Sequence, residues 1–210
     1  MGEVVAQSAA VVDIVSDVEI TLVRAKARGG QWWAIAELEL VPAAALVHQA
    51  KAPVAADELA YRQALAVQSM ADQHADDLVG AIRDELFNLL GRPGPNAERV
   101  MTLLFPAGAV GYTRVPLATQ PAKMGKLATL LDTVTHPAIP AGWGPAHAVK
   151  VRDAAGKLRV AVAAATEAKG VFDQSSEVYT ALARSAQTAL ARTKRLWKGY
   201  GRSEADIHLV

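Results

Sequence analysis

Cysteine is absent from all 210 residues of the sequence. Without a thiol, the chain cannot form a disulfide framework, a thiolate nucleophile, a cysteine-ligated zinc site or an iron–sulfur cluster. Cysteine-free chains are typical of reducing compartments, so this absence favours the cytoplasm.

Long apolar runs are also missing. No stretch reaches the ~18 consecutive apolar residues that a membrane-spanning helix needs. The most apolar N-terminal segment, residues 4–23, is interrupted by Asp13, Asp17 and Glu19, and no basic residue precedes it. A signal peptide needs a basic start and an unbroken apolar centre. We therefore predict neither a membrane span nor a signal peptide, and we expect a cytoplasmic protein.

Motifs for nucleophilic catalysis and phosphate binding are lacking as well. The sequence has no Gly-x-Ser-x-Gly and no Ser-x-x-Lys, and its glycine-containing turns at 91–95 and 108–111 lack the Lys-Ser/Thr that follows a P-loop. The sequence therefore predicts no cofactor and indicates no small-molecule substrate.

Apolar residues recur at helical spacing through most of the chain. From 57 to 90 the gaps are three and four residues, as on one face of an α-helix. The same spacing predicts helices over 96–105, 121–134, 145–169 and 175–200. Together these segments predict an all-α protein, an antiparallel bundle of long helices with short central helices and loops.

The N-terminal segment is the ambiguous part of this prediction. Val11, Val15, Val18 and Leu22 fit a helical stripe, which favours a helix. However, residues 18–41 are rich in β-branched and aromatic side chains around a Gly-Gly pair. An N-terminal β-hairpin at about 18–41, in an α+β fold, is therefore the alternative.

Proline and glycine cluster at about 92–95, 106–116 and 137–145. In the last cluster Trp143 needs a surface to pack on, which indicates an ordered loop rather than a flexible linker. None of the three is long and polar enough to divide the chain, so residues 1–210 are predicted to form a single helical domain.

Charge is distributed unevenly along the chain. Residues 1–113 hold eight basic and fourteen acidic residues, whereas residues 114–210 hold fourteen basic and seven acidic. Halves of opposite charge can pack on each other or on further copies, and the basic half can also bind an acidic partner. Basic residues with aromatic neighbours near the C-terminus make nucleic acid a possible partner. These candidate binding residues are Arg184, Arg192, Lys194, Arg195, Lys198 and Arg202.

Trp32 and Trp33 are adjacent, and adjacent residues on a helix point about 100° apart. One is expected in the core and the other partly exposed, and an exposed tryptophan beside an alanine-rich face would mark an interface. The pair Trp32 and Trp33 is therefore a candidate contact site.

His74 lies on the predicted apolar stripe and Asp77 follows three residues later, so both are predicted to face the bundle interior. A histidine–carboxylate pair inside a bundle is a minimal start for a metal site. The Glu-x-x-His motif of di-metal bundles is absent, so a structural histidine is the stronger interpretation of His74.

These patterns favour a non-catalytic helical protein that works through self-association or as a subunit of a larger assembly. The first alternative is a nucleic-acid-binding protein that uses the basic C-terminal helix. The second is a metal-assisted enzyme at His74 and Asp77.

Overall fold

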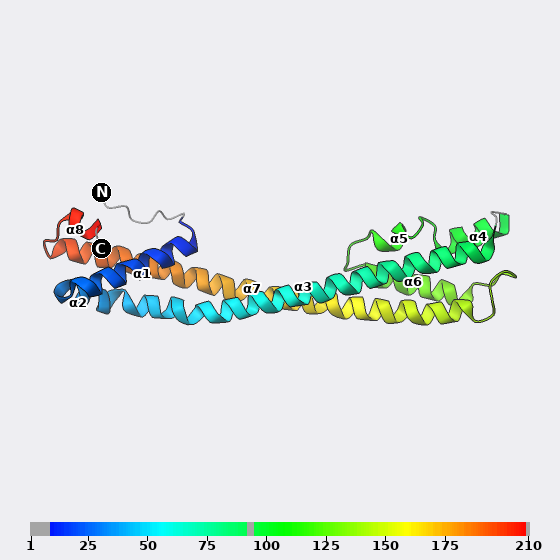
Figure 1. The fold of residues 1–210 in the computed structure, drawn as a ribbon, viewed down its shortest axis with the longest axis horizontal. Helices are drawn as coiled ribbons and strands as arrows, with labels where there is room; N and C mark the ends of the chain where they lie inside the picture. The colour runs from blue at the N-terminus through cyan, green and yellow to red at the C-terminus, as the bar shows by residue number, and fades with distance from the viewer. Residues whose placement is uncertain (1–8, 92–94, 209–210) are drawn as a thin grey trace. The chain divides into compact units, whose positions relative to one another are not determined.

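The computed structural model describes residues 9–91 and 95–208, which contain no β-strand. The all-α prediction is confirmed (Figure 1). The helices are α1 (Val11–Arg28), α2 (Gly30–Glu39), α3 (Val41–Leu90), α4 (Pro95–Leu104), α5 (Val110–Thr113), α6 (Gln120–Thr133), α7 (Trp143–Gly199) and α8 (Glu204–His208).

The chain divides into two compact units. The terminal unit comprises Met1–Leu59 and Gly170–Val210, and the central unit comprises Ala60–Lys169. Both units contain part of α3 and part of α7, because these two helices are continuous. The single-domain description therefore stays a prediction.

The β-hairpin alternative for residues 18–41 is wrong. Ile14, Val18, Thr21 and Ala25 are buried at gaps of three and four residues, so one face of α1 packs inward along its whole length. Gly29 and Gly30 have φ of 65° and 52°. Glycine adopts these left-handed angles without a steric cost, so the Gly-Gly pair joins two helices rather than two strands.

α3 begins sixteen residues earlier than the helix predicted from 57 to 90. Pro53 lies inside it, and proline in a helix interior removes one backbone hydrogen bond. The turns before Pro53 nevertheless pack well, because Leu40, Ala44 and Val47 join Val18 and Leu190 in one buried cluster. This tertiary packing outweighs the local preference.

α7 is one helix of 57 residues where the sequence predicts two, over 145–169 and 175–200. The intervening serines favour helix starts in isolation. Within α7 the Ser175 hydroxyl instead donates to the carbonyl oxygen of Phe172 at 3.1 Å. This local bond satisfies the hydroxyl without ending the helix.

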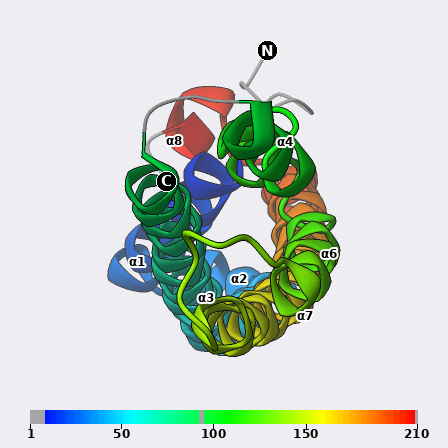
Figure 2. The ribbon, with the colours of Figure 1, turned by 90° about the vertical axis from the view of Figure 1, so that its right-hand side faces the viewer.

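The core of the central unit is formed by α3, α6 and α7 (Figure 2). The short helices α4 and α5 contact α6. Met124, Leu127 and Leu131 of α6 are fully buried, as their spacing predicts. Tyr112 of α5 donates its hydroxyl to the carbonyl oxygen of Leu104 at 2.7 Å, which joins α5 to the end of α4.

The three predicted proline- and glycine-rich connections have different outcomes. The connection at 92–95 lies almost wholly outside the described residues. The one at 106–116 contains α5. The one at 137–145 runs into the first turn of α7, where Trp143 is buried.

No helix among residues 9–91 and 95–208 combines the length and apolarity needed to cross a bilayer.

Candidate interaction surfaces

Trp32 and Trp197 form the centre of a tryptophan cluster in the terminal unit. Their ring centroids are 4.9 Å apart, and the Trp197 indole N–H donates to the backbone carbonyl of Trp32 at 3.2 Å. Ala25, Ala36 and Ile207 complete this buried cluster. Trp32 is buried and Trp33 is half-buried, so the expected division between a core and a partly exposed tryptophan is confirmed. Their role in an interface stays a prediction.

Three cations surround these tryptophans. The Arg28 and Arg202 guanidinium carbons lie 4.7 and 5.3 Å from the centroid of the Trp32 ring, and the Lys26 ammonium lies 5.6 Å from that of Trp33. Lys26 and Arg28 occupy the last turn of α1, where cations suit the helix dipole. We call Lys26, Arg28 and Arg202 the tryptophan-bound cations.

The six predicted nucleic-acid-binding residues differ in whether they form an ion pair with a carboxylate of the described residues. Arg192 contacts Glu39 at 3.0 Å, and Lys198 contacts Glu204 at 2.6 Å. The Lys198 ammonium lowers the pKa of the Glu204 carboxyl. Among the described residues, the other four form no ion pair with a carboxylate. These four are Arg184, Lys194, Arg195 and Arg202.

His74 does not face the interior, so that prediction is wrong. Its side chain is exposed, while Ala75, Val79 and Ile82 are buried. Asp77 is also exposed and accepts a 2.8 Å hydrogen bond from Gln73. No group of three or more histidine and carboxylate side chains is placed to hold a metal in the part of the chain that the structure describes.

Among the histidines whose side chains the structure describes, the one that faces the core is His147. Its Nε2 lies 3.2 Å from Glu85, and the same carboxylate accepts the Trp143 indole N–H at 2.7 Å. The rings of Trp143 and His147 pack at 4.5 Å. One carboxylate of α3 thus fixes two side chains of the first turns of α7. Sequence analysis missed His147, although it lies one turn before Val151 on the predicted apolar stripe of 145–169.

A second buried polar contact joins α6 to α3. Gln120 is almost fully buried and donates its amide N–H to Asp76 at 2.8 Å, while its amide oxygen has no partner. Burial raises the pKa of Asp76, and the neighbouring charges of Asp72 and Asp77 raise it further, although the Gln120 hydrogen bond opposes this.

We expect Asp76→Asn to stabilise the protein at neutral pH. The raised pKa means that the folded state binds the Asp76 proton more tightly than the unfolded state does. Stability therefore falls as pH rises from the unfolded pKa through the folded one. Asparagine keeps an acceptor for Gln120 without the charge. Urea unfolding of both proteins should give free energies that converge at acid pH, and a gap independent of pH would contradict this expectation.

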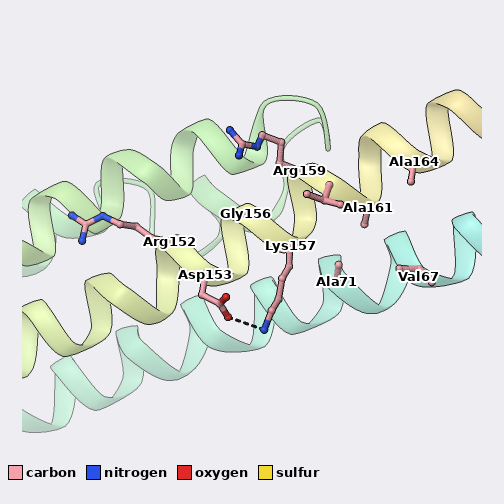
Figure 3. A pocket seen from close by; sticks show the side chains of 10 residues that line it. Val67, Ala71, Arg152, Asp153, Gly156, Lys157, Arg159, Ala161 and Ala164 are labelled. Atoms are coloured by element: carbon pink, nitrogen blue, oxygen red, sulfur yellow. Dashed lines mark ion pairs between the residues drawn. The ribbon is translucent and has the colours of Figure 1, made fainter.

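An apolar groove of about 660 Å³ lies between α3 and α7 in the central unit. Val67 and Ala71 of α3 lie opposite Ala161 and Ala164 of α7, and the Asp153–Lys157 ion pair of 2.8 Å lies at its edge (Figure 3). We call this the central groove. The other residues that line it are Arg152, Gly156, Arg159 and Val160.

The terminal unit has a smaller groove of about 370 Å³ between the same two helices. It is lined by Pro53 and Val54 of α3 and by Val171 and Val178 of α7, among other residues. Val178 is half exposed. The buried residues between 178 and 190 are Ala183, Ala186 and Leu190.

Comparisons with family models, with curated proteins and with solved structures gave no match to this chain.

Proposed function

We propose that this protein acts through self-association, with a second copy of the chain seated in the central groove. The observation that carries the proposal is the exposure of large apolar side chains along this groove. Val67 is 58% exposed and Val160 is 65% exposed, while Met70, one turn from Val67, is 73% exposed.

Among the described residues of the central unit, no third helix covers this part of the groove, which leaves its apolar side chains exposed. α6 begins at Gln120, which bonds to Asp76. The stretch of α3 from 60 to 74 precedes that contact, and it contains no buried residue. Opposite it, only Ala161 and Ala165 of α7 are buried among residues 160–169. Two helices alone shield one stripe each, so the other apolar faces remain in water.

A second copy suits the groove in shape and in charge. Alanine and glycine at 71, 156, 161 and 164 allow a helix to approach closely. Within the central unit, α3 carries five acidic and two basic residues, whereas α7 carries two acidic and five basic. A two-fold axis that places α3 of one copy over α7 of the other brings opposite charges together.

We expect the purified protein to be a dimer or larger oligomer, and Val160→Glu to dissociate it. Burying a valine side chain contributes about 1.5–3 kcal/mol, and a glutamate in the same place would carry an unpaired charge into the contact. Size-exclusion chromatography with light scattering over a wide concentration range measures the mass.

Val149→Glu is the matched control. Val149 lies on the same helix with 64% exposure, but it does not line the central groove. The Val149→Glu variant should leave the oligomer intact. A chain that is monomeric at every concentration, or a dissociation caused by the control alone, would show that the proposal is wrong.

A further inference from the structure

We propose that the tryptophan-bound cations, Lys26, Arg28 and Arg202, bind the phosphate backbone of a nucleic acid. All three belong to the terminal unit, so the proposal does not rest on self-association through the central groove. The site differs from the one that the sequence suggests, because two of its three cations come from α1.

None of these three cations forms an ion pair with a carboxylate among the described residues. Arg202 only donates a long hydrogen bond of 3.4 Å to the amide oxygen of Gln31. Their combined charge is therefore free to attract an anion from outside the chain.

An aromatic ring holds the two guanidinium groups. Arg28 and Arg202 both lie against the Trp32 ring, and this ring is fixed by its contact with Trp197. A guanidinium that stacks on an aromatic ring keeps its in-plane N–H donors available. Two phosphate-binding groups are thus positioned in advance, which lowers the entropy cost of binding.

The tryptophan-bound cations differ from other basic residues of the terminal unit that form ion pairs. Arg192 and Lys198 are basic residues of the same unit, yet each is neutralised by a glutamate of its own chain. The glutamate offsets the charge of each cation, which weakens its attraction for a phosphate. The contribution of each basic residue to binding should therefore depend on whether it forms an ion pair, rather than on its position in the basic segment.

A nucleic acid fits the surface better than a membrane does. Membrane-surface helices insert bulky apolar side chains beside their cations. Here Trp32, over which two of the cations lie, and Trp197 are both buried and cannot insert. Accessible aromatic residues of the unit include the half-buried Trp33 and the exposed Tyr200, and accessible aromatic rings suit the stacking of bases.

Binding of the full chain to a labelled oligothymidylate, measured by fluorescence anisotropy at several salt concentrations, tests the proposal. We expect binding that weakens with salt. Each phosphate contact of a single strand contributes a slope of roughly −0.7 to the dependence of log K on log salt. Arg28→Gln and Arg202→Gln should each reduce the slope by about that amount.

Lys198→Gln is the control, because it removes the same charge from a residue already paired with Glu204. It should leave the slope unchanged. Circular dichroism establishes that each variant is folded. Lys26→Gln is a further variant, and the lysine side chain that it replaces is exposed.

Three results would overturn the proposal. The first is no binding at low salt. The second is an equal loss of slope in Lys198→Gln and in the two arginine variants. The third is binding to phosphatidylserine-containing vesicles without binding to the oligonucleotide, which would assign the surface to a membrane.

Discussion

Trp197→Ala should destabilise the terminal unit by about 3–5 kcal/mol, the usual loss for removing a buried tryptophan. Trp197 is 1% exposed and is the largest fully buried side chain among the described residues. Its ring packs on Trp32, and its indole N–H donates to the Trp32 carbonyl. The substitution would therefore leave a cavity and remove this hydrogen bond.

Tyr200→Ala is the matched control for this substitution. Tyr200 is an aromatic residue three positions later that is 60% exposed, and exposed substitutions usually change stability by less than about 0.5 kcal/mol. Urea unfolding followed by circular dichroism compares the two variants. Because the chain has two units, hydrogen exchange should place the loss in the terminal one. Equal losses for both variants would mean that Trp197 does not hold the unit together.

Gly144→Ala should destabilise the central unit by about 1–3 kcal/mol or more, because the added methyl group has no space. A Cβ atom at this position would lie 2.2 Å from the backbone carbonyl oxygen of Leu131 and 3.3 Å from a methyl group of Val134. A backbone atom cannot move aside as a flexible side chain does. The start of α7 would have to shift away from the end of α6.

Gly80→Ala should have the opposite effect. Gly80 lies inside α3 in the same unit, and a Cβ atom there would meet nothing within 4 Å. Alanine is favoured over glycine in a helix interior by about 0.5–1 kcal/mol. Thermal unfolding of the two variants should thus shift the midpoint in opposite directions. A shift to lower temperature in Gly80→Ala as well would contradict this expectation.

The candidate surfaces were predictable only in part. The basic residues near the C-terminus could be selected by their type alone, and Trp32 and Trp33 by their adjacency. Sequence reasoning could not find Lys26 and Arg28 beside Arg202, because more than 170 residues separate the two segments. It also could not tell that Arg192 and Lys198 are neutralised within the chain.

The failure at His74 has a similar physical origin. Alanine is small enough to be buried or exposed, and in α3 it occurs on several faces of the helix. The spacing of apolar residues then shows that a helix forms, but it does not fix which face turns inward. The packing of α6 and α7 selects the face with Ala75, Val79 and Ile82, about 100° from His74.

The sequence by itself determined that the chain is helical and excluded every chemistry that needs a thiol. Both follow from local properties, namely the three- and four-residue spacing and the absence of cysteine. Only the tertiary structure decided that α3 and α7 continue past Pro53 and Gly170. It also decided which faces of these helices are buried and which cations lack acidic partners. These features depend on contacts between segments distant in the sequence, which local spacing does not encode.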